Sequence, residues 1–288
     1  MHAALADLLG LLDLERIETN LFRGRNEQQA GPRVFGGQVM AQALRAASHT
    51  VADPEQSRLP HSLHGYFLRP GDSRRQILFD VEHSRDGGSF TTRRVRAIQK
   101  GESIFSMSVS FQIEEAGLEH QTAIGDWPAP EALEDDVLTA QRLGEENPNV
   151  MPWTLRERPF EVRSVYPVGT PQPDTAVKPA WYRARSPLPD DPVLHCCLLA
   201  YVSDMGLMST SLVPHAQRAP RSAISGASLD HAMWFHRQLR VDDWFLYDRD
   251  SPIASGSRGF NRGSFHDRSG MLAASAAQES LIRVRSDR

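Results

Sequence analysis

The fold is decided by an apolar stretch, PVLHCCLLAYVSDMGLM, which occupies residues 192–208. At 17 residues, with a histidine, a serine and an aspartate inside it, the stretch is short and polar for a bilayer crossing. We predict a helix, and because it is apolar nearly all round, we expect it to be buried on every side. Its adjacent cysteines, Cys196 and Cys197, could pair only in a strained disulfide and are predicted to be small packing residues.

The acid within this stretch, Asp204, is the first candidate functional residue. It is the only carboxylate between Asp191 and Asp230. A carboxylate in so apolar a segment loses hydration, so it neutralises, finds donors, or is kept because chemistry needs it. The structural alternative is an acid at a helix end that reaches solvent.

A second apolar segment, VFGGQVMAQALRAA at residues 34–47, begins a similar pattern in the first half of the chain. Each segment is followed by four strand-like runs, at residues 62–68, 76–82, 89–99 and 103–112, and at 228–236, 243–248, 253–262 and 271–283. The tetrapeptide YFLR at 66–69 precedes WFHR at 234–237 by 168 positions. Shared order and a near-constant shift indicate an internal duplication.

Each half therefore combines one buried helix with strands in hairpin succession, which favours an antiparallel sheet curled about that helix. The predicted fold class is α+β, with two such copies. Leucines at helical spacing in residues 5–12 predict a helix that caps the first copy. The acidic, proline-bearing residues 118–159 are predicted to be a connector with a short helix around 132–143, between domains 1–117 and 160–288.

Composition and motifs exclude several classes of function. The formal charge of −4 does not favour nucleic acid as a partner, and the N-terminus lacks the pattern of a secretion signal. We expect a cytoplasmic protein without a membrane segment. The sequence has no H-E-x-x-H, dinucleotide or P-loop motif, so neither a metal nor another cofactor is expected. The run GASLD at 226–230 lacks the last glycine of a nucleophile elbow, which disfavours a serine acyl-enzyme.

Several motifs together resemble acyl-CoA thioesterase II, the TesB type. They are LFRG at 21–24, RVFGGQV at 33–39, HSLHGYFLRPGD at 61–72, DGGSF at 86–90, RRV at 93–95, SFQ at 110–112 and LDHAMWFHR at 229–237. The resemblance runs in matching order from about Leu8 to about Glu279. It implies a double hotdog fold that hydrolyses acyl-CoA to a free fatty acid and CoA, without metal or covalent intermediate. It also implies a homodimer or homotetramer.

The resemblance further implies three catalytic residues, all in the second copy. They match Asp204 in VSD, Ser228 two positions before DHAMWFH, and Gln278 in AAQE. The well-known members have threonine where this chain has Ser228. Serine keeps the hydroxyl and loses the methyl, so its hydrogen bond should survive while its rotamer becomes freer.

This combination suits thioester hydrolysis. A carboxylate can accept the proton of water, and an amide and a hydroxyl can orient that water. We hypothesise Asp204 as base, with Gln278 and Ser228 positioning the water. Gly36 and Gly37 are candidate oxyanion donors at a helix start, or they only let helix and sheet pack closely. His61 is a candidate for the substrate site, or a structural histidine in a strand.

Two other functions remain open from the sequence. The first is an acyl-CoA binding protein that has lost turnover, against which the retained Asp204, Ser228 and Gln278 argue. The second is a hotdog hydratase or dehydratase acting on enoyl-CoA. That chemistry would want an Asp and a His paired as acid and base, and Asp204 has no obvious such partner in the sequence.

Overall fold

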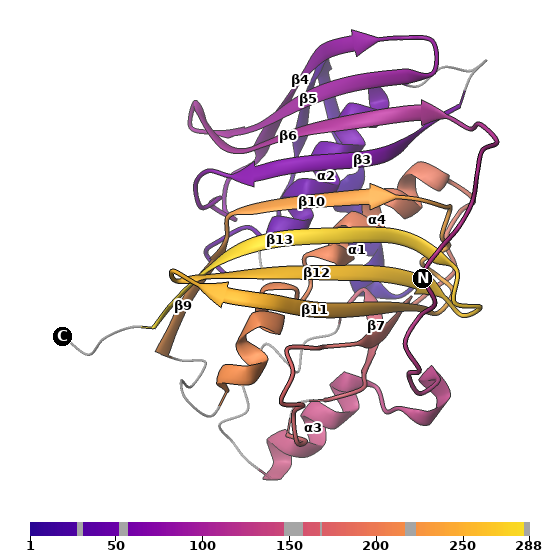
Figure 1. Ribbon diagram of the computed structural model, residues 1–288. Helices are drawn as coiled ribbons and strands as arrows, with labels where there is room; N and C mark the ends of the chain where they lie inside the picture. Colours follow the sequence, from indigo (N-terminus) through magenta and orange to yellow (C-terminus); the bar gives the residue numbers. More distant parts are fainter. Residues whose placement is uncertain (28–30, 52–56, 147–157, 168, 217–222, 285–288) are drawn as a thin grey trace.

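The computed structural model describes residues 1–27, 31–51, 57–146, 158–167, 169–216 and 223–284. Within them the strands form one antiparallel sheet, in the order β1-β2-β4-β5-β6-β3-β10-β13-β12-β11-β8-β7, with β9 pairing to β13 (Figure 1). The predicted α+β class and the two helix-and-sheet copies are confirmed. The single sheet running through both copies was not predicted.

The first copy wraps its strands around helix α2 (Gly36–His49), of which ten residues are buried. Its strands are β1 (Glu15–Glu18), β2 (Leu21–Gly24), β3 (Arg58–Phe67), β4 (Ile77–Asp86), β5 (Phe90–Gln99) and β6 (Glu102–Ile113). Alternation along β5 turns Thr91, Arg93, Val95 and Ala97 inward. Helix α1 (Ala3–Leu12) buries Leu5, Leu8 and Leu12 in the core, as its leucine spacing predicts.

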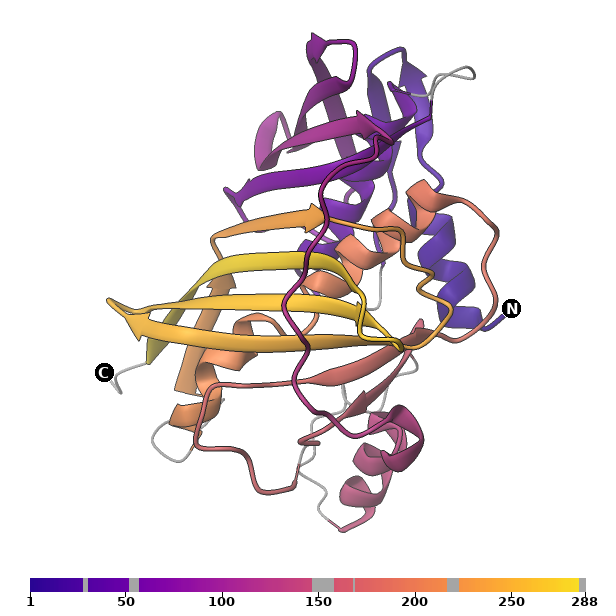
Figure 2. The same cartoon turned by 45° about the vertical axis from the view of Figure 1, so that its right-hand side comes forward.

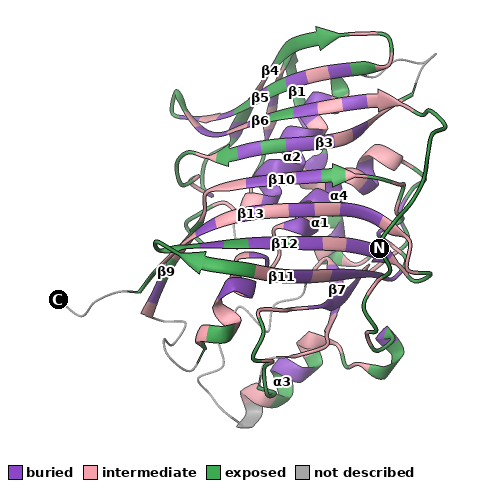
Figure 3. Ribbon diagram, in the orientation of Figure 1, coloured by how far each residue is buried: buried purple, intermediate pink, exposed green. Residues whose placement is uncertain are grey.

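The second copy repeats this plan around helix α4 (Pro192–Ser203). The strands are β7 (Phe160–Ser164), β8 (Ala180–Ala184), β9 (Ile224–Ser228), β10 (Asp230–Phe235), β11 (Phe245–Ser255), β12 (Arg258–Asp267) and β13 (Leu272–Val284), and a 3-10 segment η3 (Met208–His215) follows the helix. Asp191 caps α4 by accepting from the Leu194 N–H at 3.1 Å, and Pro192 occupies the first turn. Figure 3 shows α2 and α4 largely buried.

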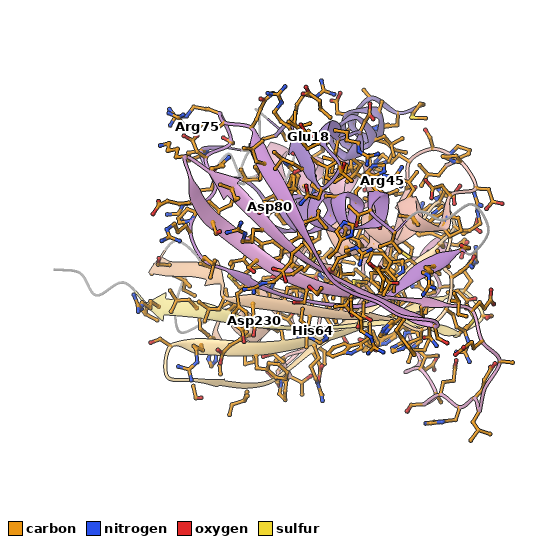
Figure 4. All side chains as sticks on the ribbon, turned by 90° about the horizontal axis from the view of Figure 1, so that it is seen from above. Glu18, Arg45, His64, Arg75, Asp80 and Asp230 are labelled. Atoms are coloured by element: carbon orange, nitrogen blue, oxygen red, sulfur yellow. The ribbon has the colours of Figure 1, made fainter. Side chains whose placement is uncertain are left out.

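The strand positions support the duplication. Strand β4 begins at residue 77 and β11 at 245, and β5 begins at 90 and β12 at 258, so both pairs are 168 positions apart. The two half-sheets meet where β3 pairs with β10, for example Leu63 with Met233. Figure 4 labels His64 and Asp230, which lie close together along this junction. On the inner face, α2 and α4 pack against each other.

The connector lies across the outer face of the second half-sheet (Figure 2). Ile124, Trp127 and Leu133 pack on a cluster of Trp181, Trp244 and Leu246. The predicted connector helix corresponds to α3 (Asp136–Glu146), preceded by the turn η1 (Pro130–Ala132). Residues 147–157 of the connector lie outside the described residues, and the limits 1–117, 118–159 and 160–288 stay a prediction.

Two strand predictions differ from the structure. Residues 243–248 and 253–262 were predicted as separate strands, but β11 continues to Ser255 and turns at Gly256 and Ser257, both at positive φ. Strand β11 continues past Pro252 with an irregular register between Asp250 and Ile253. A proline in a strand pattern predicts a break, so the sequence indicated two strands here. The hairpins β1–β2 and β7–β8 were not predicted.

Residues 192–215, α4 together with η3, are long and apolar enough to cross a membrane by length and composition. Half of the most apolar window is buried inside the protein, and a sheet-wrapped core helix meets the same criteria. The absence of a membrane segment stays a prediction.

Candidate active site

Asp204 directly follows α4, and its carboxylate receives hydrogen bonds from three other parts of the chain. Gln278 Nε2 donates to Oδ1 at 2.7 Å, and Ser228 Oγ donates to the same oxygen at a longer 3.4 Å. The backbone N–H of Gly37 donates to Oδ2 at 2.9 Å. The structure thus brings together the three predicted catalytic residues and the two predicted glycines, of which Gly37 donates to Asp204.

Strand pairing places Ser228 beside Gln278. Ser228 ends β9 and pairs with Ser280 on β13, so Gln278 lies two residues away along the neighbouring strand, on the same face. Gln278 is 1% exposed, whereas Ser228 is half-buried. The amide is therefore fixed inside the sheet, while the hydroxyl stands closer to solvent.

The start of α2 approaches the end of α4 so closely that only glycine fits. A Cβ on Gly37 would lie 2.5 Å from the Tyr201 carbonyl oxygen, and one on Gly36 would lie 2.8 Å from Asp204 Oδ2. The positive end of the α2 dipole also favours a carboxylate here. Both glycines therefore serve close packing, and Gly37 also donates to Asp204. Their role as oxyanion donors stays a prediction.

Buried polar groups fix the backbone around Asp204. Tyr247 Oη donates to the Ser203 carbonyl at 2.6 Å, and Arg249 Nη1 donates to the Met205 carbonyl at 2.9 Å. Gly206 turns the chain at φ 74°, where a Cβ would lie 2.6 Å from Arg249 Nη1. Tyr247 and Arg249 are almost fully buried, so the position of the carboxylate is set by a rigid surrounding.

His231 is the site residue that the sequence reasoning missed. It is 1% exposed, its Nδ1 lies 3.0 Å from Gln278 Nε2, and its Nε2 lies 2.9 Å from Ser203 Oγ. Burial lowers the pKa of His231 to about 4, although the charge of Asp204 opposes this shift. Its signal was the alternation in DHAMWF, which turns His231 and Met233 toward the core.

His61 is not part of this cluster. It lies in β3, four residues from Gly65, and Gly65 is the residue that pairs with His231. The His61 ring contacts Phe90 at 5.5 Å between ring centres, and burial lowers its pKa. His61 is also the extra residue of an irregularity between Pro60 and Ser62. Its role in substrate binding stays a prediction.

The two cysteines are poor candidates for nucleophiles. Burial raises the pKa of Cys196 to about 12, and burial raises the pKa of Cys197 further. A thiol in such surroundings stays protonated and unreactive. Both cysteines are free within α4, as the prediction of packing residues requires.

Residues 153–281 match the acyl-CoA thioesterase family, and residues 25–112 match the acyl-CoA thioesterase N-terminal domain. The chain is 39% identical to acyl-CoA thioesterase 2 of Haemophilus influenzae, over 98% of this chain and 99% of that protein. It is also 39% identical to acyl-coenzyme A thioesterase 8 of Homo sapiens, over 96% of this chain and 88% of the human protein.

Two solved structures resemble this chain over nearly its whole length. The crystal structure of acyl-CoA thioesterase II TesB2 from Mycobacterium marinum is similar with a TM-score of 0.79 and 43% identity, over 97% of this chain and 99% of that one. A conserved protein of unknown function with a hotdog fold from Alicyclobacillus acidocaldarius has a TM-score of 0.78 at 19% identity, covering 99% of this chain and all of that one. This second likeness supports the fold alone.

Proposed function

This chain belongs to the acyl-CoA thioesterase II (TesB-type) family and is an acyl-CoA thioesterase, and we propose that it hydrolyses its substrate with a water molecule activated by Asp204. The contacts of Asp204 with Gln278, Ser228 and Gly37 are the observation that supports this proposal. These contacts connect Asp204, which its apolar context indicated, to Ser228 and Gln278, which the family resemblance implies.

In the proposed reaction, the water oxygen attacks the thioester carbonyl carbon while Asp204 accepts a proton from that water. The tetrahedral intermediate then expels the CoA thiolate, which recovers the proton, so the products are a fatty acid and CoA. Because a thiolate leaves readily, the mechanism requires no strong acid at sulfur. General-base assistance of this kind contributes about 10² to 10⁴ in rate.

The polar contacts indicate different roles for Gln278 and Ser228. Both amide hydrogens of Gln278 are engaged, one by Asp204 and one by His231. Gln278 therefore acts on the water chiefly through the carboxylate that it orients. Ser228 has a long contact and a half-buried hydroxyl, so we assign it to orienting the attacking water.

The alternative functions find less support. Asp204 and His231 are not directly paired, since the Gln278 amide lies between them. A hydratase or dehydratase would use an acid and a base that both reach the substrate, whereas His231 is buried behind Gln278. A binding protein without turnover has no need of a carboxylate oriented by three donors.

Replacing Asp204 tests the proposal. We expect Asp204→Asn to lower turnover of acyl-CoA by about 10² to 10⁴, because the amide cannot accept the proton. Free thiol release is the measurement, with Asp243→Asn, an exposed carboxylate, as the matched control. Near-normal turnover in folded Asp204→Asn would overturn the assignment, and water addition to enoyl-CoA without thiol release would favour a hydratase.

The family resemblance also implies a homodimer or homotetramer and is compatible with a cytoplasmic protein. Both stay predictions.

A further inference from the structure

A chain of hydrogen bonds runs behind Asp204 through Gln278 and His231 to Ser203. Gln278 Nε2 lies 2.7 Å from Asp204 Oδ1 and 3.0 Å from His231 Nδ1. His231 Nε2 lies 2.9 Å from Ser203 Oγ, and Ser203 Oγ donates to the Ala200 carbonyl at 2.8 Å. Gln278 and His231 are each 1% exposed, so water does not readily replace either partner.

The chemistry of these groups fixes the direction of every bond. An amide nitrogen only donates, so His231 Nδ1 must accept and carries no proton. The proton of the neutral ring is then on Nε2, which donates to Ser203 Oγ. Ser203 in turn donates its own proton to Ala200, so each donor in the chain has one acceptor.

The opposite orientation of the Gln278 amide is disfavoured by the carboxylate of Asp204, which only accepts. If the amide were rotated by half a turn, its oxygen would face that carboxylate, and His231 would need the other tautomer, with the proton on Nδ1. Ser280 Oγ lies 3.0 Å from Gln278 Oε1 and tolerates either orientation, because a hydroxyl both donates and accepts. With its nitrogen toward Asp204, the amide has a second N–H, and His231 Nδ1 is the buried acceptor for it.

We propose that His231 is a positioning residue for the hydrolysis, which accepts one N–H of the Gln278 amide and so holds the other N–H against Asp204. The inference rests on the proposed role of Asp204 as base. The hydrogen bond from Gln278 fixes the carboxylate that accepts the proton of the attacking water. Without His231, the second N–H is buried without an acceptor, so the amide can rotate away from Asp204 to satisfy it.

The first test compares two variants, His231→Leu and His231→Asn, by thiol release at pH 7. We expect His231→Leu to lower kcat by about ten- to a hundredfold, the value of one hydrogen bond to a charged group, while KM stays within about twofold. His231→Asn should recover most of the loss in kcat, since its Oδ1 can take the place of Nδ1 as acceptor.

Recovery of kcat in His231→Asn at unchanged KM is the readout that a merely structural role would not give, because asparagine supplies the acceptor but not the bulk of the imidazole ring. If folded His231→Leu keeps the wild-type kcat, or if His231→Asn loses as much as His231→Leu, the inference is wrong.

A second measurement uses the unaltered protein and does not depend on the folding of a variant. Side-chain ¹⁵N NMR at pH 7 should show His231 with a protonated Nε2 and an unprotonated Nδ1. A proton on Nδ1 would contradict the proposal, because it would require the amide oxygen of Gln278 to face the ring.

The outcome for Asp204→Asn separates this inference from the proposed function. If Asp204→Asn stays active, Asp204 is not the base, and the proposed function is wrong. If Asp204→Asn is inactive while folded His231→Leu keeps the wild-type kcat, only the proposed role of His231 is wrong.

Discussion

The two hotdog copies share strand order and length, but the polar groups that hold Asp204 have apolar or neutral counterparts in the first copy. A shift of 168 relates Arg93 to Asn261 and Leu63 to His231. Arg93 pairs with Val109 and Asn261 pairs with Gln278, so Gln278 corresponds to Val109, 169 positions earlier. The helices correspond when counted from Gly36 and Pro192. The second-copy residues and their first-copy counterparts are Asp204 and Ser48, His231 and Leu63, and Gln278 and Val109.

The two central helices, α2 and α4, also begin with different residues. Helix α2 begins with Gly36 and Gly37, whose small size lets Asp204 accept a backbone N–H. Helix α4 begins with Pro192, which has no N–H, and Asp191 caps it. Arg45 pairs with Asp191 at 3.3 Å near that start.

The comparison indicates that both copies keep the fold, whereas the polar side chains of the candidate site occur only in the second copy. The candidate site needs the end of one central helix and the start of the other, so it uses both copies. The reverse junction, between the end of α2 and the start of α4, contains an ion pair instead of a hydrogen-bonded carboxylate facing glycines. We therefore expect one active site per chain.

Among the tests of this comparison, the largest effect should come from giving Gln278 the residue of the first copy. We expect Gln278→Val to lower kcat by about 10² to 10³, because it removes a donor to Asp204 and leaves His231 Nδ1 buried without a partner. Thiol release measures the effect. Val109→Ala is the control in the first copy, and an equal loss of kcat per folded molecule there would show that the copies do not differ in chemistry.

The pH dependence of the unfolding free energy should also reflect the difference between the copies. His231 can bind a proton, whereas its first-copy counterpart Leu63 cannot. The folded-state pKa of His231 is lowered by burial from 6.5 to about 4, so between these values the unfolded chain binds more protons. The stabilisation is present above pH 6.5 and is lost as pH falls toward 4, by about 3 kcal/mol. Denaturant unfolding should show a weaker pH dependence over this window in His231→Leu.

The other histidines with lowered pKa add to the wild-type slope, so the informative quantity is the difference between the two proteins. They are His49, His61, His195, His236 and His266. Equal slopes for wild type and His231→Leu would mean that His231 is not held neutral by burial.

A smaller effect is expected where the copies touch, at Gly37. The added Cβ of Gly37→Ala would meet the Tyr201 carbonyl at 2.5 Å, so the α2–α4 contact must shift, at about 1 to 3 kcal/mol of unfolding free energy. Turnover should fall as well, because Asp204 moves away from its backbone donor. Gly88→Ala is the control, since nothing lies within 4 Å of its Cβ. Equal stability of the two variants would contradict the close approach.

Much of this comparison could be predicted from the sequence, because buried helices and alternating strands leave periodic patterns. The short hairpin β1–β2 was missed since β1 is exposed along its whole length and has no alternation. The pairing of β3 with β10 was missed because backbone hydrogen bonds between distant strands leave no mark on side-chain patterns.

The site was only partly accessible for the same reason. Asp204 could be found from its apolar surroundings, whereas Ser228 and Gln278 were identified through the family resemblance. The bond between Gly37 and Asp204 joins residues 167 positions apart, and no local signal encodes it. His231 lay in a motif that was recognised, but a strand histidine is usually structural, and its link to Gln278 requires the folded register.

The smallest effect should follow from Ser228, a position where the family resemblance implies threonine. We expect Ser228→Thr to keep kcat within about twofold, because the hydroxyl is retained and the added methyl only restricts χ1. Ser228→Ala should lower kcat by about three- to tenfold, the value of the one hydrogen bond by which Ser228 is proposed to orient the attacking water. Both follow from thiol release at saturating acyl-CoA. A loss in Ser228→Thr as large as that in Ser228→Ala would mean that the methyl obstructs the site, and that the serine is required by space beside Asp204 rather than by its hydroxyl.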